Sequence, residues 1–310
     1  LTRRGLTDVP TGISGFGTRH RAYVKVQDGC VMPCAYCIIP KVRPRRASRP
    51  IPHVTDEVCR LIENGHREIV LTGIHLGHYG VDLPQPAAEL TDLVRRLAEL
   101  PGEFRIRLSS LDAVEVDDRL IDLLAEFPRR LCPHLHLSLQ SGSSSVLRRM
   151  RRRDTAASFL DRCRQLQTRL ALPAITTDLI VGFPGETEDD FSETCRMVEQ
   201  AGFAKVHVFR FSPRNGTAAA TMPDQVPDGL RHQRMLALEA IAEKTGRQYL
   251  AGLLGRPLQV LVETPLDGSA DRWLGTAERY VPVEVTATAR EEGQFVEATP
   301  VRVEKDRLLA

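Results

Sequence analysis

Cys30, Cys34 and Cys37 lie within eight positions of one another, although the chain has only seven cysteines in 310 residues. They follow C-x3-C-x2-C spacing and come directly after an apolar, strand-like stretch, AYVKVQ (22–27). Three thiolates close together suit a soft metal centre, and iron–sulfur clusters are held by cysteine thiolates. On a four-iron cluster, three cysteines would leave one iron free to bind an external chelating molecule.

Two alternatives to an iron–sulfur cluster stay open for this spacing. A structural zinc site usually takes four ligands in paired knuckles, but the second pair is missing, and neither His20 nor His53 is at knuckle spacing. A chance cluster of cysteines is the second alternative. The remaining cysteines fall in helical or strand-flanking segments and are predicted to be core or surface thiols: Cys59, Cys132, Cys163 and Cys195.

The composition is that of a soluble globular protein, with 42% hydrophobic and 26% charged residues. No apolar stretch reaches the roughly 18 residues of a membrane span, and no signal peptide is visible, so a cytoplasmic location and no membrane partner are expected. Net charge is only +2, but residues 1–60 carry eleven Lys/Arg and four Asp/Glu. This asymmetry favours either a polyanionic partner near the cysteines or simply a solvated surface.

Short apolar or β-branched runs alternate with longer segments of helical periodicity from residue 22 to about 250. The expected strands are 22–27, 68–74, 104–110, 134–140, 175–183 and 205–211. The expected helices are 54–64, 87–99, 117–126, 154–169, 187–201 and about 228–252. Six strands alternating with helices predict parallel βαβ units. A closed eight-fold barrel would need two more units, so the prediction is an α/β fold with an open six-unit (βα)6 partial barrel or a doubly wound sheet.

The pattern changes after Gly255. Four strand-like runs, 260–263, 273–278, 280–287 and 294–304, are separated by turn residues. They predict a small all-β module, with a five-stranded barrel as the expected form. The resulting domain prediction is a linker remnant at 1–19, an α/β core at 20–250 and the β-module at 251–310.

The cysteine spacing, its position after the first strand and the aromatic Tyr36 before the third cysteine resemble the radical S-adenosylmethionine (SAM) superfamily. The resemblance implies a [4Fe-4S] cluster on Cys30, Cys34 and Cys37, whose open iron chelates the methionine part of SAM. An electron from the cluster then cleaves SAM to a 5′-deoxyadenosyl radical, while the protein orients and shields the chemistry. An electron donor of the flavodoxin or ferredoxin type is expected as a partner.

Longer stretches narrow the resemblance to the methylthiotransferases, which insert sulfur and then a methyl group at a C–H bond. These stretches are LTGIHLGHYG (71–80), SSLDAVEVDDRL (109–120), HLHLSLQSGSSSVLRRMRRRDT (134–155), TTDLIVGFPGETEDDF (176–191) and HVFRFSPRNGTAAATMPDQVP (207–227). The first and last look most like the tRNA N6-threonylcarbamoyladenosine methylthiotransferases. The C-terminal module resembles the RNA-binding TRAM β-barrel.

Ligands of parallel α/β folds bind beyond the carboxyl ends of the strands, and several motifs fall at such ends. Thr72 and Gly73 are implied to lie near the amino group of SAM, and Ser138 and Gln140 at its ribose. The backbone around Tyr36 and Ile38 would border the adenine. Gly73 and the pair Val181 and Gly182 complete the expected site, since glycine lets the backbone approach a nucleoside closely.

Two arginine runs follow predicted strand ends. Arginine suits phosphate because its planar fork donates two hydrogen bonds at once. The predicted contacts to a tRNA anticodon stem-loop are Arg43, Arg45, Arg46, Arg49, Arg148 and Arg152. A solvated helix face explains the second run equally well.

The resemblance implies methylthiolation at C2 of N6-threonylcarbamoyladenosine beside the anticodon, at position 37 of tRNA. Alternatives are isopentenyladenosine in tRNA, a ribosomal-protein aspartate, or a non-catalytic RNA-binding fragment. Family members carry an N-terminal domain whose three cysteines hold a second four-iron cluster. The chain starts with Leu1. It is expected to lack this domain and to be a part of a longer methylthiotransferase.

Overall fold

The computed structural model describes residues 20–84, 88–266 and 271–310. The predicted linker 1–19 lies outside these ranges. Six parallel strands form the first part of the chain in sequence order: β1 (Arg21–Asp28), β3 (Glu68–Gly73), β4 (Arg105–Leu108), β5 (His134–His136), β6 (Ala174–Val181) and β7 (Lys205–Arg210). The short β2 (Ala47–Ser48) pairs antiparallel with β1. All six predicted strands are therefore present.

Each parallel strand neighbours the next one in sequence, which is the topology of a partial barrel and not of a doubly wound sheet. β1 pairs with β3 and β3 with β4, while β5 pairs with β6 and β6 with β7. Isolated parallel bridges, Ile106–Leu131 and Leu111–Leu137, connect the two groups. β7 has no further strand neighbour among the described residues, so the barrel is open on that side.

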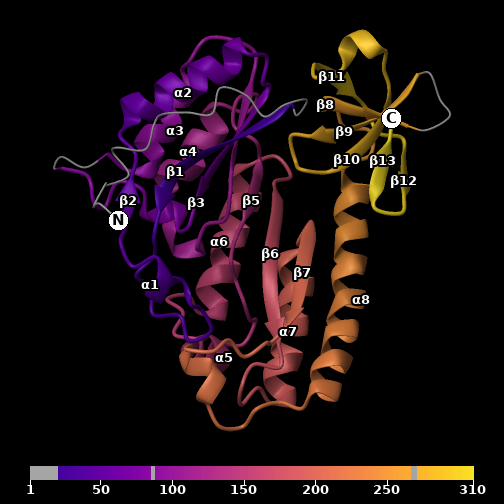
Figure 1. The fold of residues 1–310 in the computed structure, drawn as a ribbon. Coiled ribbons are helices and arrows are strands. Elements are labelled where there is room, and N and C mark those ends of the chain that lie inside the picture. Colours follow the sequence, from indigo (N-terminus) through magenta and orange to yellow (C-terminus); the bar gives the residue numbers. More distant parts are fainter. Residues whose placement is uncertain (1–19, 85–87, 267–270) are drawn as a thin grey trace.

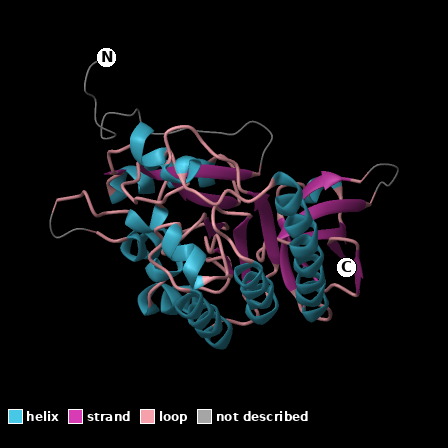
Figure 2. Cartoon of the chain, turned by 90° about the horizontal axis from the view of Figure 1, so that it is seen from below, coloured by secondary structure: helices cyan, strands magenta, loops and turns pink. Residues whose placement is uncertain are grey.

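The helices form an outer layer along the curved strands (Figures 1 and 2). They are α1 (Ile39–Val42), α2 (Ile51–Glu63), α3 (Leu90–Ala98), α4 (Asp118–Glu126), α5 (Ser144–Arg149), α6 (Ala156–Arg169), α7 (Glu188–Ala201) and α8 (Asp228–Gly252). Apolar residues of α2 to α8 pack on buried strand residues such as Val24, Leu71 and Leu179 in one continuous core. No helix of the described residues is long and apolar enough to cross a membrane.

The starts of α7 and α8 agree closely with their sequence signals, whereas the expected starts at 54 and 87 differ by three residues from those of α2 and α3. The predicted capping signal before α7 is confirmed: the Asp190 N–H donates to Thr187 Oγ1, and Thr187 N–H donates back to Asp190 Oδ2. α8 follows Pro227 and has the bounds that the sequence predicts.

The C-terminal module differs from the expected five strands. It is one six-stranded sheet in the order β11-β8-β9-β10-β13-β12. Its strands are β8 (Leu258–Pro265), β9 (Arg272–Ala277), β10 (Pro282–Thr286), β11 (Phe295–Ala298), β12 (Arg302–Glu304) and β13 (Arg307–Leu309). The predicted single strand 294–304 is wrong: it divides around Pro300, whose missing N–H interrupts a ladder.

Buried ion pairs attach this module to the amino-terminal ends of the barrel strands. Glu68, at the start of β3, accepts hydrogen bonds from Arg105 Nε at 2.6 Å and Arg107 Nε at 2.8 Å. Arg105 Nη1 donates onward to the Gln259 carbonyl at 2.7 Å, and Arg107 Nη1 to the Glu278 carbonyl at 2.9 Å. The module thus lies at the end of the barrel opposite to the cysteine loop.

Candidate active site

The cysteine loop begins immediately after β1 and is held in place by backbone hydrogen bonds. Cys30 N–H donates to the Arg43 carbonyl at 3.1 Å, Cys37 N–H to the Cys34 carbonyl at 3.1 Å, and Ala35 N–H to the Met150 carbonyl at 2.9 Å. Gly29 starts the loop with a φ of +76°, and a Cβ there would lie 1.6 Å from the Arg45 carbonyl oxygen. Only glycine fits this turn.

The loop after β3 contributes a histidine to the first cysteine. His75 Nδ1 lies 3.3 Å from Cys30 Sγ, and its Nε2 lies 2.5 Å from Glu115 Oε1. Burial opposes the charge on this ring, but its bonds with Cys30 and Glu115 raise the pKa of His75 to about 9. Burial likewise disfavours the Cys30 thiolate, yet His75 and the Met32 N–H together lower the pKa of the thiol. The site therefore favours a thiolate at Cys30.

A second ion-pair network supports the other side of the loop. Arg152 Nη2 donates to Asp112 Oδ1 at 2.5 Å and to the Ser138 carbonyl at 2.7 Å. Burial raises the pKa of the Cys34 thiol, and the nearby Arg152 charge opposes this shift. Arg152 thus joins β5 to the cysteine loop.

The three cysteines fit an iron–sulfur cluster better than a zinc ion. All three thiols are free; Cys30 is buried, and Cys34 and Cys37 are half-buried. His75, His78 and Glu115 have possible ligand atoms that all lie within 4.8 Å of one another. Among the described residues, the sulfurs of the three cysteines do not meet this limit. At least one pair of these sulfurs is therefore more than 4.8 Å apart; sulfurs around one tetrahedral ion would be roughly 4 Å apart, so this arrangement suits a cluster of several irons better than one zinc ion.

The predicted SAM residues lie at the expected strand ends. Thr72 and Gly73 end β3, and Ile38 precedes α1. Tyr36 packs against a small apolar cluster that includes Phe183 and Phe211, and burial raises the pKa of its hydroxyl. These placements bring the segments to the same end of the barrel as the cysteines.

The structure gives another reason for glycine at positions 73 and 182 than contact with a nucleoside. A Cβ on Gly73 would lie 3.1 Å from Gln27, and a Cβ on Gly182, whose φ is +72°, would lie 2.1 Å from Arg231 Cγ. Their missing side chains therefore accommodate protein neighbours. The Val181 side chain is fully buried, which leaves only its backbone for ligand contact.

Ser138 and Gln140 follow β5. The Gln140 N–H donates to the Asp178 carbonyl at 2.9 Å, and its own carbonyl accepts from Ile180 N–H at 2.8 Å. Its φ of +74° is unusual for a residue with a side chain. Five other non-glycine residues of the described part of the chain also have a positive φ, so ligand contact at Gln140 stays a prediction.

The predicted RNA contacts divide into two sets. Arg43, Arg45 and Arg148 are exposed and Arg46 is half-exposed, beside the cysteine loop and on α5. Arg49 forms an ion pair with Glu57 at 2.5 Å, and Arg152 is paired with Asp112. Their side chains are only 12% and 6% exposed, which speaks against the predicted phosphate contacts at these two positions.

Sequence reasoning assigned no role to His75, Glu115 or Asp112, although the stretches 71–80 and 109–120 contain them. The feature of the sequence that could have identified these three residues is that the two stretches come directly after β3 and β4. Arg153 Nη2 also pairs with Glu115, and His78 stacks on His75 with ring centroids 3.8 Å apart. The network links three strand ends to Cys30.

Comparison with known proteins agrees with this geometry. Residues 24–198 match the family model of the radical SAM superfamily, and the chain belongs to this superfamily. Membership implies a [4Fe-4S] cluster and SAM. Coproporphyrinogen III oxidase (HemN) from Escherichia coli, a radical SAM enzyme, shares the fold with a TM-score of 0.52 at 16% identity, over 74% of this chain and 54% of that one.

Among curated proteins, the chain is 40% identical over 252 residues to threonylcarbamoyladenosine tRNA methylthiotransferase MtaB from Thermotoga maritima. It is 34% identical over 277 residues to tRNA-2-methylthio-N(6)-dimethylallyladenosine synthase from Desulfitobacterium hafniense. These matches cover 80% and 89% of this chain, but 56% and 62% of the relatives. The chain is thus homologous to radical SAM tRNA methylthiotransferases and spans about three fifths of their length.

Proposed function

We propose that this chain is the radical SAM part of a tRNA methylthiotransferase that acts in the cytoplasm on N6-threonylcarbamoyladenosine at position 37. The observation that carries the proposal is the cysteine loop at the carboxyl ends of the barrel strands, in a chain homologous to such enzymes over most of its length. Relatives of both nucleoside specificities match, and a ribosomal-protein aspartate is the remaining alternative substrate.

In this proposal, Cys30, Cys34 and Cys37 hold the cluster and leave one iron for SAM. The bound cluster supplies the electron that cleaves SAM. His75 and the Met32 N–H stabilise the Cys30 thiolate, while Arg152, paired with Asp112, lies beside Cys34 on the other side of the loop. Thr72, Gly73, Ser138, Gln140 and the backbones of Tyr36, Ile38, Val181 and Gly182 surround SAM.

RNA binding is assigned to the exposed arginines at the mouth, Arg43, Arg45, Arg46 and Arg148, and to the TRAM-like C-terminal module. Arginine forks hold phosphates and orient the stem-loop, while an unstacked loop base enters the site. The single tryptophan, Trp273, is only 5% exposed and belongs to the module core, so it is not a stacking platform for a base. The sulfur to be inserted would come from a second cluster in an N-terminal domain, and electrons from a flavodoxin- or ferredoxin-like donor.

Anaerobic reconstitution with iron and sulfide tests the cluster. The chain should take up about four irons and produce 5′-deoxyadenosine from SAM under a strong reductant. Cys37→Ser should lose iron, whereas Cys59→Ser on α2 should keep it. Wild-type chain that takes up no iron yet still binds tRNA would favour the non-catalytic RNA-binding alternative.

Nucleoside mass spectrometry tests the substrate. In cells that lack the full gene, 2-methylthio-N6-threonylcarbamoyladenosine should disappear from tRNA. Loss of the methylthio derivative of isopentenyladenosine instead would transfer the assignment to that nucleoside.

A further inference from the structure

A cavity of about 970 Å³ extends through the inside of the partial barrel; we refer to it as the lumen cavity. It reaches Thr72 and Ser110 at the carboxyl ends of β3 and β4. At its other end it reaches Tyr280 and the β12–β13 hairpin of the C-terminal module. Thr72 is the one predicted SAM residue in its lining, so the cavity meets the predicted SAM site there and runs from it into the interior of the barrel, where the substituent of a bound nucleoside can extend.

The lining of the lumen cavity is rich in basic groups. Six lysines and arginines and three histidines line it, against three acidic residues. Four of the basic side chains are already neutralised by ion pairs: Arg21 with Glu263, Arg107 with Glu68, Arg247 with Glu243 and Arg279 with Glu278. Lys205 and Lys305 have no carboxylate within 4.0 Å among the described residues.

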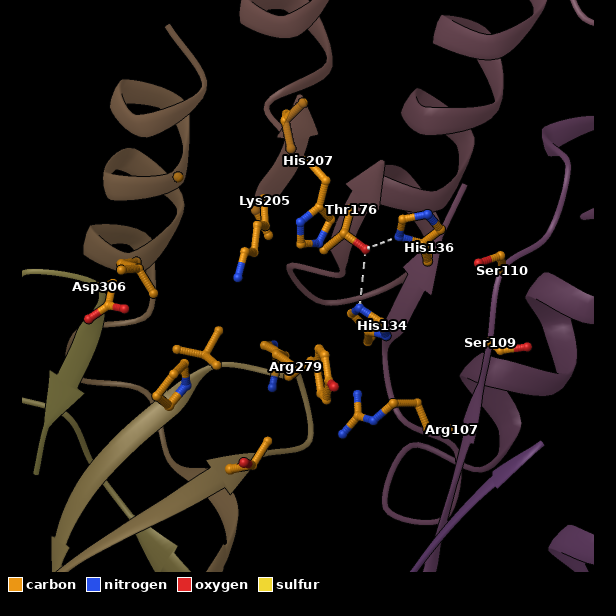
Figure 3. Close-up of a pocket in the computed structure, with 18 of the residues that line it drawn as sticks. Arg107, Ser109, Ser110, His134, His136, Thr176, Lys205, His207, Arg279 and Asp306 are labelled. Atoms are coloured by element: carbon orange, nitrogen blue, oxygen red, sulfur yellow. Dashed lines mark hydrogen bonds between the residues drawn. The ribbon is translucent and has the colours of Figure 1, made fainter. Parts of the chain in front are cut away.

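Of these two lysines, Lys205 belongs to the barrel itself. It begins β7 and faces the cavity together with His207, two positions further along the same strand (Figure 3). His207 lies across from His136 on β5, with ring centroids 6.3 Å apart, and His136 Nδ1 is 3.1 Å from Thr176 Oγ1. Burial and the nearby Lys205 charge lower the pKa of His207, so it offers a neutral donor and acceptor.

The two candidate nucleosides differ most in what they would place beside this lysine. A threonylcarbamoyl group carries a free carboxylate and a hydroxyl, whereas a dimethylallyl group is a hydrocarbon. Covering an ammonium with hydrocarbon removes its water without a compensating partner, which is costly. A carboxylate instead forms a charge-assisted hydrogen bond.

We propose that Lys205, with His207 beside it, binds the carboxylate of the threonylcarbamoyl group and selects this nucleoside against dimethylallyladenosine. The inference rests on the proposed function, because it names the substrate determinant of that same site. Selection acts in both directions: the carboxylate gains a partner, and the hydrocarbon leaves the lysine without one.

The test measures binding of anticodon stem-loop RNAs to the chain by fluorescence anisotropy. Four RNAs differ only at position 37: threonylcarbamoyladenosine, its methyl ester, dimethylallyladenosine and adenosine. The variant is Lys205→Met, which keeps the length of the side chain and removes its charge. The matched control is Lys244→Met, on a lysine of α8 that is 67% exposed and does not line the lumen cavity.

Wild-type chain should bind the threonylcarbamoyl RNA about tenfold more tightly than its methyl ester, as expected for a hydrogen bond to a charged group. Lys205→Met should remove this difference, tighten the binding of the dimethylallyladenosine RNA by removing the cost of covering the ammonium, and leave the affinity for the adenosine RNA unchanged. Lys244→Met should preserve it. Thermal melts of both variants check that they fold like the wild type.

Equal affinity of the wild-type chain for acid and ester overturns the inference and leaves the proposed function standing. A uniform loss for all four RNAs in Lys205→Met also overturns it, since Lys205 would then be a phosphate contact. If wild-type chain binds none of the stem-loops, the proposed function fails, and the inference fails with it.

Discussion

Replacing Glu68 by glutamine should weaken the attachment of the C-terminal module to the barrel and lower the free energy of unfolding. The Glu68 side chain is fully buried and accepts hydrogen bonds from Arg105 and Arg107 at 2.6–2.9 Å, with Arg21 Nε 3.9 Å from Oε1. The glutamine side chain would keep the volume but remove the charge, and its NH2 group would face the guanidinium groups that Glu68 satisfies.

Loss of one partner from a buried ion pair costs about 3–5 kcal/mol, because the other charge stays buried without compensation. We expect Glu68→Gln to lower the free energy of unfolding by that amount, a large part of the roughly 5–15 kcal/mol typical of a domain. Urea unfolding followed by the fluorescence of Trp273, the only tryptophan and a core residue of the module, measures the loss.

Glu126→Gln is the matched control. Glu126 also pairs with an arginine, Arg95, but the two side chains are 49% and 45% exposed. The Glu126→Gln variant should therefore have the same unfolding midpoint as the wild type. A change below about 1 kcal/mol in Glu68→Gln would refute the reasoning, because it would mean that the three arginines need no buried carboxylate.

Three further outcomes are expected. Burial alone would raise the pKa of Glu68, but the neighbouring guanidinium groups outweigh burial and hold this pKa well below its usual range. The stability that the Glu68 carboxylate contributes is therefore complete above about pH 4.3, the pKa of an unfolded glutamate, and is lost as the pH falls towards the folded pKa. The stability gap between wild type and Glu68→Gln, measured in urea series at several pH values, should therefore narrow by about 1.4 kcal/mol per pH unit below that point; a gap independent of pH down to 3, about one unit below the unfolded pKa, would contradict it. Gly29→Ala should disorder the cysteine loop and lower reconstituted iron content, whereas Gly229→Ala, where a Cβ meets open space, should not; equal iron in both would contradict the steric argument. Thr187→Ala should cost about 1 kcal/mol of unfolding free energy by removing the cap of α7, and Thr168→Ala on exposed α6 surface should cost less in the same urea assay.

The strand and helix pattern was predictable because the barrel repeats one simple unit. Each strand is a short apolar run between turn signals, and each helix has an apolar face that packs on it. The C-terminal module was harder to predict, since its last three strands, β11, β12 and β13, have only four, three and three residues. The dipeptide Thr299-Pro300 divides one expected strand, and the last three-residue strand, β13, is below the length at which alternation can be read.

The candidate site was predictable where the motif is local and unpredictable where it depends on contacts across the barrel. The spacing of Cys30, Cys34 and Cys37 is visible in the sequence. His75 contacts Cys30, which lies 45 positions away in the sequence. Arg152 is enclosed beside Asp112, which lies 40 positions away. Arginines of the run 148–153 look alike in sequence, yet only the fold decides that Arg148 faces solvent while Arg152 is enclosed.

The open side of the barrel also gives α8 a role. β7 offers an unpaired strand edge, and an exposed edge is a template for pairing with another chain. α8 lies beside β7 along its length (Figure 1), and it approaches so closely that a Cβ on Gly246 would lie 3.2 Å from the Ala204 carbonyl oxygen. We therefore expect this helix to shield the β7 edge from pairing with another chain, and a truncation that removes α8 together with the C-terminal module should yield insoluble material even though every strand of the barrel is retained.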